Sequence, residues 1–201
     1  MEVLPGDVLP ASQRYGPGTE NGRALVAGRV EEHKNVVLIS SNFKRYVPAA
    51  RDLVIGVVHQ RLADHYRVVL QPHSKPVKLD QLAFENATKK NKPNLVPGDV
   101  VYGRVLTTAP DLDDEIECYD SKTGKSTGLG QLKEGTVVNV RLGFARHLMY
   151  HGHPALDQLG KRHAFELAIG VNGRVWVQGP SPRATLEICR AIEEQDRLFI
   201  N

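Results

Sequence analysis

Gly124-Lys125-Ser126-Thr127 is the segment that most resembles a nucleotide-binding motif. A phosphate-binding loop needs a further glycine five residues before its second glycine, because its backbone must wrap around the phosphates. Position 119 is a tyrosine, and the residues before it are acidic and would repel a phosphate. We therefore interpret the segment as an exposed linker between two modules.

Four of the eight histidines lie close together in the sequence and could bind a metal ion: His147, His151, His153 and His163. The first two are four residues apart, a spacing that places both imidazoles on one face of a helix. The glutamate of an HExxH motif is missing, and a glycine and a proline interrupt the helix at residues 152 and 154. We predict surface histidines and no metal site.

A run of acids, DLDDEIECYD at residues 111–120, could offer oxygen ligands to a divalent cation. The glycine and the distal glutamate of a calcium-binding EF-hand loop are absent, so we predict an acidic surface loop around Asp111, Asp113, Asp114 and Glu115. The chain also has no G-x-S-x-G motif and no pair of acids that stands out as a catalytic dyad. The sequence therefore predicts no catalytic residues and no cofactor.

Lys89, Lys90 and Lys92 are the residues best suited to bind a ligand, which would be the backbone of a nucleic acid. Each lysine is a compact charge that can replace a counterion beside a phosphate. Arg51 and Arg104, which lie in the same predicted domain, complete the predicted RNA-binding set. The alternative is that the lysines only keep an exposed loop soluble.

Composition limits the kind of protein that carries these residues. The chain has 201 residues, of which 41% are apolar and 24% charged, as in globular proteins of one to three domains. The longest apolar stretch, at residues 53–58, is too short to cross a bilayer, and the N-terminus lacks the pattern of a secretory signal. Cys118 and Cys189 are too few for a disulfide framework. We expect a reducing compartment and no membrane partner.

Charge is unevenly distributed along the chain, although 26 basic and 23 acidic residues give a net charge of only +3. Residues 44–92 hold ten basic and four acidic residues, a net +6, whereas residues 111–120 hold six acids and no base, a net −6. One interpretation is two solvated faces. The other is that the basic region contacts nucleic acid, while the acidic region docks a protein or repels one.

In the first two thirds of the chain, short runs of β-branched residues are separated by turn residues, a pattern that predicts β-strands. These strands must position the candidate binding residues of that region. Residues 1–47 predict a small N-terminal β domain. Residues 48–122 predict five strands, near residues 52–59, 65–71, 75–79, 99–107 and 115–120, a number typical of an OB-type barrel. An SH3-like barrel is the competing fold.

Residues 123–201 predict an α+β domain. A strand near residues 136–142 precedes helices near 144–150 and 154–161, then a hairpin, then a helix that begins at Ser181-Pro182. The order β-α-α-β-β-α is that of a KH-like domain. The predicted fold class is mainly β with a C-terminal α+β domain.

Gly170-Val171-Asn172-Gly173 allows two interpretations. Asn-Gly between alternating apolar residues is a strong hairpin signal, because both residues tolerate the positive φ of a type I′ turn. A two-residue loop would pair Val171 with Arg174 and Ile169 with Trp176. The same residues resemble the GXXG loop that clamps phosphates in KH domains. That loop joins two helices and this one joins two strands, which favours a structural turn.

Several segments together resemble the RNA-binding cap subunits of the eukaryotic RNA exosome. They span nearly the whole chain in the same order: RYVP at residues 45–48, DLVIG at 52–56, FENATKKNKP at 84–93, GDVVYG at 98–103 and GVNGRVWV at 170–177. The stretch ATKKNKPN at residues 87–94 is similar to the Rrp-forty type rather than to its Rrp-four paralogue.

This resemblance implies an N-terminal β domain, an OB barrel of the S-one type and a KH domain in a non-catalytic subunit. It implies that the subunit sits with other cap proteins on a ring of RNase-PH-like subunits. There it would guide single-stranded RNA to an associated processive ribonuclease, in the nucleus, nucleolus and cytoplasm. It also implies a structural G-x-N-G motif, residues 170–173, packed between the OB and KH domains.

The resemblance further directs attention to the loop where a KH domain would clamp RNA. We expect this loop at residues 142–147, LGFARH, which has one glycine and no GXXG. We therefore predict that RNA contacts the OB surface instead. Two other hypotheses stay open: a stand-alone OB/KH RNA-binding factor in translation or ribosome biogenesis, and an enzyme with an unrecognised site.

Overall fold

The computed structural model describes residues 1–12, 14–16, 18–33, 35–41, 45–108, 113–120 and 123–199, without the side chain of His33. The chain divides into two compact units, Met1–Lys44 and Arg45–Phe199, which we describe separately. Within the described residues, no helix is long and apolar enough to cross a membrane.

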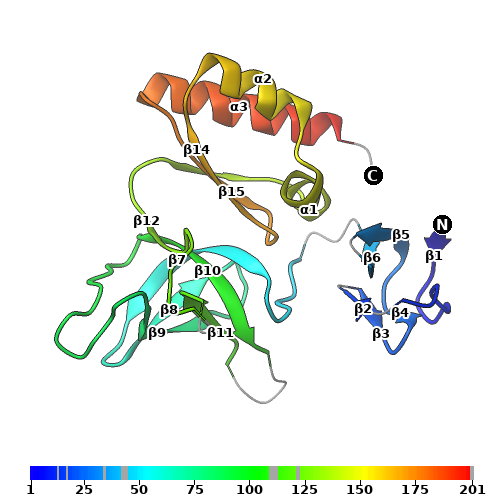
Figure 1. Ribbon diagram of the computed structural model, residues 1–201, viewed down its shortest axis with the longest axis horizontal. Helices are drawn as coiled ribbons and strands as arrows, with labels where there is room; N and C mark the ends of the chain where they lie inside the picture. Colours follow the sequence, from blue (N-terminus) through cyan, green and yellow to red (C-terminus); the bar gives the residue numbers. More distant parts are fainter. Residues whose placement is uncertain are drawn as a thin grey trace. The chain divides into compact units, whose positions relative to one another are not determined.

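The first unit is a small β domain (Figure 1, blue). Its strands are β1 (Glu2–Val3), β2 (Arg14–Tyr15), β3 (Thr19–Glu20), β4 (Arg23–Ala24), β5 (Gly28–His33) and β6 (Val36–Ser40). β1, β5, β6 and β2 form one sheet in that order, and β3 pairs with β4 in a hairpin. Asn21 and Gly22 connect β3 to β4 with φ values of 48° and 74°, the two positive values that a type I′ turn requires.

The second unit begins with a five-stranded barrel, which confirms the predicted OB architecture (Figure 1, cyan to green). Its strands are β7 (Leu53–Arg61), β8 (His65–Val69), β9 (Val77–Phe84), β10 (Val100–Thr107) and β11 (Glu115–Cys118). The order is β11-β9-β8-β7-β10, and pairing of β10 with β11 closes the barrel. A short strand, β12 (Gly130–Leu132), also pairs with β10. Alternate apolar side chains, among them Val54, Tyr66, Val68, Leu79 and Val101, fill the interior.

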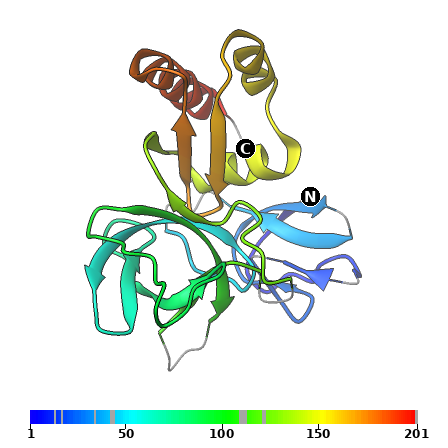
Figure 2. The ribbon, with the colours of Figure 1, turned by 60° about the vertical axis from the view of Figure 1, so that its left-hand side comes forward.

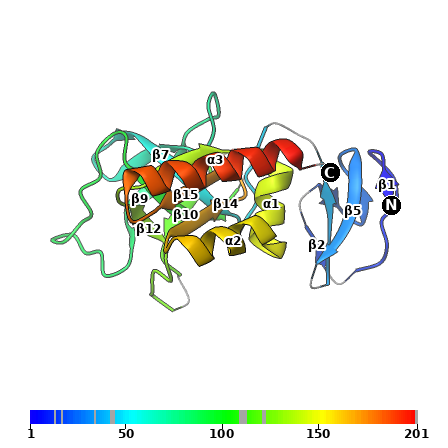
Figure 3. The ribbon, with the colours of Figure 1, turned by 90° about the horizontal axis from the view of Figure 1, so that it is seen from above.

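The rest of the second unit has the predicted β-α-α-β-β-α order. It consists of β13 (Thr136–Asn139), α1 (Leu142–His151), α2 (Pro154–Arg162), β14 (Glu166–Gly170), β15 (Arg174–Gln178) and α3 (Pro182–Leu198). The sheet order is β13-β15-β14, and α2 and α3 lie on the side of this sheet that is turned away from the barrel (Figures 1 and 3). α1 lies beside the β14–β15 hairpin and contributes Leu142 to the apolar cluster of the barrel. α3 begins where predicted, because the Ser181 hydroxyl accepts a hydrogen bond from the N–H of Ala184 at 3.2 Å.

Figure 2 shows the β14–β15 hairpin, whose register differs from the prediction. Gly170 pairs with Arg174 and Ala168 with Trp176, so the loop has three residues instead of two. Gly173 has a positive φ of 79°, but Asn172 is not among the residues with positive φ, as a type I′ turn would require. The three-residue loop instead directs the Asn172 side chain into the neighbouring barrel.

The expected position of the KH clamp loop is also wrong. Residues 142–147 lie inside α1, which Val140 and Arg141 connect to β13, and the connection between α1 and α2 is Gly152-His153. This connection has one glycine and no GXXG either. The shift in position therefore leaves the reason for favouring the OB surface unchanged.

Candidate nucleic-acid interface

Two loops lie together at one end of the barrel: the β7–β8 turn and the long segment between β9 and β10. The buried amide side chain of Gln81 connects them, because its Nε2 donates to the carbonyl of Leu62 at 3.0 Å and its Oε1 accepts from Lys92 Nζ at 3.1 Å. The N–H of Gln81 also donates to the carbonyl of Asp64 at 3.1 Å. We call this region the loop end of the barrel.

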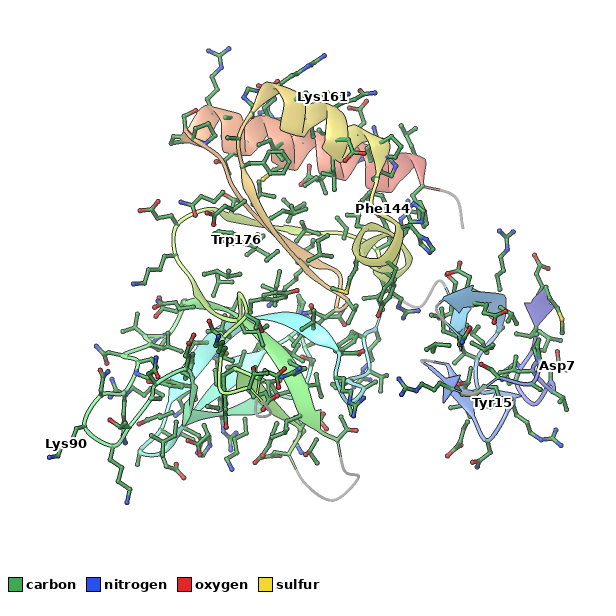
Figure 4. All side chains as sticks on the ribbon, in the orientation of Figure 1. Asp7, Tyr15, Lys90, Phe144, Lys161 and Trp176 are labelled. Atoms are coloured by element: carbon green, nitrogen blue, oxygen red, sulfur yellow. The ribbon has the colours of Figure 1, made fainter. Side chains whose placement is uncertain are left out.

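The long segment is anchored to the barrel rather than merely exposed. Leu95 is fully buried, and the hydroxyl of the buried Tyr66 donates to the carbonyl of Pro93. Thr88 and Asn91 exchange both backbone hydrogen bonds at 3.0 Å, which places Lys89 and Lys90 at the tip of a tight turn. Figure 4 shows Lys90 pointing outward from this tip.

The sequence reasoning missed Arg61, which ends β7 at the loop end. Its guanidinium donates to the side-chain oxygen of Asn94, so it lies against the lysine-bearing segment. No sequence signal marks this arginine, because the barrel fold alone brings it to residues more than 25 positions away. We call Arg61, Lys89, Lys90 and Lys92 the loop-end cations; none of the four forms an ion pair with any residue in the described ranges.

Arg51 and Arg104, which we predicted to bind RNA, lie elsewhere. Arg104 pairs with Leu53 at the start of β7, whereas Arg61 is at the end of that strand. Its guanidinium is 2.9 Å from Glu117 and 3.4 Å from Asp120, so the barrel's own acids neutralise it. Arg51 precedes β7 with a φ of 74° and donates its N–H to the carbonyl of Val105 at 2.8 Å. The structure therefore does not bring these two arginines to the loop end.

The basic and acidic segments of the sequence meet on the barrel. Lys78 lies 2.8 Å from Glu115, and Lys75 lies 2.6 Å from Asp113. Glu115 raises the pKa of Lys78, and Lys75 lowers the pKa of Asp113, as expected for opposite charges in contact. The sequence interpretation as two separate charged faces is wrong for these residues, because β11 runs beside β9. Asp111, which we also placed in the acidic loop, lies outside the described residues.

The G-x-N-G turn, residues 170–173, lies against the barrel. The Asn172 side chain is 1% exposed; its Nδ2 donates to the carbonyls of Ile55 and Leu70 at 2.8 and 2.7 Å, and its Oδ1 accepts from the N–H of Ile55 at 3.1 Å. The N–H of Val171 donates to the carbonyl of Leu53 at 2.9 Å. These contacts leave the side chain of the asparagine no free donor with which to bind a phosphate.

Close backbone approach explains both glycines of this turn. A Cβ on Gly170 would lie 2.7 Å from the nitrogen of Ile55, and a Cβ on Gly173 would lie 2.6 Å from the carbonyl oxygen of Val140. Trp176 packs next to the turn with Ile55 and Ala168 in a shared cluster (Figure 4). We interpret the turn as the seam between the two domains.

Arg174 and Gln71 extend this seam, a role that the sequence analysis assigned to neither residue. Arg174 Nη1 donates to the carbonyl of Val69 at 2.9 Å, and burial lowers the pKa of its guanidinium. Gln71 Nε2 donates to the carbonyl of Asn172 at 3.2 Å. The seam therefore contains a buried charge that is solvated by barrel carbonyls and is unsuited to bind RNA.

Three of the four clustered histidines, His147, His151 and His153, lie at the end of α1 and on the α1–α2 connection, whereas His163 follows α2 and lies 3.8 Å from Glu187. The ring centroids of His147 and His151 are 5.2 Å apart, and His147 also lies 5.2 Å from the ring of Phe199. His153 accepts a hydrogen bond from the N–H of Ala155 and so caps α2. Among the described residues, no three His, Cys, Asp or Glu side chains converge as a metal site would require.

Comparison with known proteins agrees with this architecture. A family model described as the S1 domain of exosome complex component RRP40 matches residues 46–130, and a KH domain model matches residues 135–183. One solved structure, described as an exosome complex RNA-binding protein, aligns with a TM-score of 0.59 at 19% identity, over 76% of this chain and 86% of that one. At this identity the solved structure supports the fold alone.

Relatives over nearly the full length are more specific. Exosome complex component RRP40 of Saccharomyces cerevisiae is 38% identical over 96% of this chain and 87% of that protein. Rrp40 of Schizosaccharomyces pombe is 40% identical over 94% and 85%, respectively. Exosome complex component Rrp4 of Pyrobaculum aerophilum is 30% identical over 98% and 87%.

Proposed function

Because this chain belongs to the RRP40 family of exosome complex components, as the sequence resemblance predicted, we propose that it is a non-catalytic, RNA-binding cap subunit. In this proposal it sits with other cap subunits on a ring of RNase-PH-like subunits in the nucleus, nucleolus and cytoplasm. There it guides single-stranded RNA to an associated processive ribonuclease for 3′-to-5′ processing and degradation. The observation that carries the RNA contact is the set of four loop-end cations: three lysines on an anchored loop and Arg61 at the end of β7, none of them paired with a carboxylate of a described residue.

Lysine and arginine without carboxylate partners suit phosphates. They lose little by exchanging counterions for a nucleic-acid backbone, and this exchange makes binding tolerant of sequence and sensitive to salt. Within the described loop end, Tyr66 is buried in the barrel core, so it is not available for base stacking. We therefore expect phosphate contacts to dominate over base recognition.

Replacing Lys89, Lys90 and Lys92 together with alanine should flatten the dependence of log affinity on log salt by up to about 2 units, because each phosphate contact contributes about 0.7 on a single strand. The measurement is a salt titration of binding to a labelled single-stranded RNA. A matched control replaces Lys161, Arg183 and Arg190, three exposed cations of α2 and α3, and should leave the slope unchanged. Equal slopes for wild type and the loop-end variant would show that these lysines do not touch RNA.

The isolated chain should not degrade RNA, since its sequence offers no set of residues for the chemistry. A labelled RNA incubated with the purified chain and Mg²⁺ should stay intact for as long as a control without protein. Divalent-dependent degradation that a point mutation in this chain abolishes would contradict the proposal.

Assembly separates the cap-subunit role from that of a stand-alone factor. In gel filtration with reconstituted RNase-PH-like ring subunits, the chain should elute with the ring. A chain that elutes alone in the presence of an intact ring would favour the stand-alone factor.

A further inference from the structure

The second and third strands of an OB barrel, with the loops that flank them, are the usual surface on which this fold binds oligonucleotides. In this chain those strands are β8 and β9, whose outward side chains include His65, Arg67, Lys78 and Asp80. The register places Arg67 beside Lys78 and His65 beside Asp80. This surface therefore offers basic residues at the positions where a nucleic acid would lie.

Acids from the segment that leads into β11 lie on the same surface. Asp113 is 2.6 Å from Lys75, and Glu115 is 2.8 Å from Lys78. Asp64 is 2.7 Å from His65, and the pKa of Lys78 is raised first by Glu115 and further by Asp80 and Asp64. We call the following set the β8–β9 face: Asp64, His65, Arg67, Lys75, Lys78, Asp80, Asp113 and Glu115.

The balance of charge on this face opposes RNA. With His65 neutral, three positive charges stand against four negative charges, a net charge of −1. A phosphate that approaches Lys75 or Lys78 meets a carboxylate that already contacts the ammonium group, and the negative charge of that carboxylate repels the phosphate. None of the loop-end cations contacts a carboxylate among the described residues, although Asp64 lies in the β7–β8 turn at the same end.

We propose that Asp113 and Glu115 form an electrostatic mask, which holds Lys75 and Lys78 and excludes single-stranded RNA from the β8–β9 face. The mask confines RNA to the loop end. This inference rests on the proposed RNA-binding function, because it states which surface of the barrel that function uses and which it withholds.

The test compares the full wild-type chain with an unmasked variant, Asp113→Asn with Glu115→Gln. Both substitutions keep the shape of the side chain, and the two side chains are 49% and 39% exposed, so the fold should persist. The probe is a labelled, mixed-sequence single-stranded RNA, longer than the about 4–16 nucleotides that one OB barrel covers.

The unmasked variant should bind this RNA more tightly at low salt. Two released lysines neutralise two more phosphates, so the salt slope should steepen by up to about 1.4 units. The gain over wild type should then shrink about sevenfold between about 50 and 200 mM salt. Adding Lys75→Ala and Lys78→Ala to the unmasked variant should return the slope to the wild-type value.

A control of equal charge change is Glu193→Gln with Glu194→Gln, two exposed acids of α3 that form no ion pair with a described residue. It should leave the slope unchanged. An unchanged slope in the unmasked variant, an equal change in the α3 control, or a gain that survives removal of both lysines would each overturn the mask.

The same experiment distinguishes failure of the mask from failure of the proposed function. If the loop-end lysine variant loses binding but the unmasked variant equals wild type, the mask fails and the proposed function stands. If wild type does not bind and the unmasked variant binds through Lys75 and Lys78, the mask stands and the loop-end contact fails. If neither protein binds RNA, the mask is overturned.

Discussion

Replacing Asn172 with alanine should lower the free energy of unfolding by about 3–5 kcal/mol, because it leaves buried backbone groups of the barrel without partners. The side chain makes three hydrogen bonds to β7 and to the residue that follows β8. Without it, the N–H of Ile55 and the carbonyl of Leu70 lose these partners, at about 1–3 kcal/mol each. The carbonyl of Ile55 retains Arg174 Nη1 at 3.4 Å.

Urea denaturation followed by tryptophan fluorescence measures this loss, since Trp176 is the single tryptophan and lies beside the turn. The matched control is Asn139→Ala, an exposed asparagine at the end of β13, for which we expect a change within about 0.5 kcal/mol. If Asn172→Ala lost less than about 1 kcal/mol, these hydrogen bonds would not stabilise the seam as proposed.

Gly173→Val should lower the free energy of unfolding by a similar amount, about 3–5 kcal/mol, for two separate reasons. At a φ of 79° a β-branched side chain is strained, and the added Cβ would lie 2.6 Å from the carbonyl oxygen of Val140. The RNA affinity of the protein that remains folded should stay within about twofold of wild type, because phosphate contacts are proposed to lie at the loop end.

Gly128→Val separates the two reasons. Gly128 has a φ of 88°, and a Cβ there would meet nothing within 4 Å, so this variant reports strain without a clash and should lose only about 1–3 kcal/mol. Thermal melting of the two variants gives the difference. A Gly173→Val protein that keeps its melting temperature but binds RNA weakly would instead identify the turn as a phosphate clamp.

The dipeptide Asn-Gly occurs in two hairpins of this chain, and comparing them shows how well a local sequence signal predicts the conformation of a turn. At residues 21–22 it forms the type I′ turn that the dipeptide favours, with two positive φ values. At residues 172–173 the hairpin is present, but its loop has three residues and a different register. The second turn differs because Asn172 makes its hydrogen bonds with residues 102 to 117 positions away, and those bonds outweigh the local preference.

The distribution of charge likewise shows that local sequence does not determine tertiary contacts. The net charges of residues 44–92 and 111–120 can be counted in the sequence, but the residues with which these charges form ion pairs cannot be identified there. In the barrel, β11 pairs with β9 and β10, and as a result Glu115 forms an ion pair with Lys78 and Glu117 forms one with Arg104. Which lysines remain available to a phosphate therefore depends on strand order.

The sequence by itself determined the order of the five barrel strands and of the KH-like elements, and it identified the exposed lysines at residues 89–92. Its resemblance to known proteins, over whole segments, indicated the OB and KH architecture and the family. The order of elements follows from local signals, namely alternation, turn residues and helix caps, which act within a few residues of one another. Only the tertiary structure decided that Arg61 joins those lysines, that Arg104 does not, and which backbone groups of the barrel Asn172 binds. Each of these depends on contacts between residues far apart in the chain, and such contacts exist only once the barrel has closed and the KH sheet has packed against it.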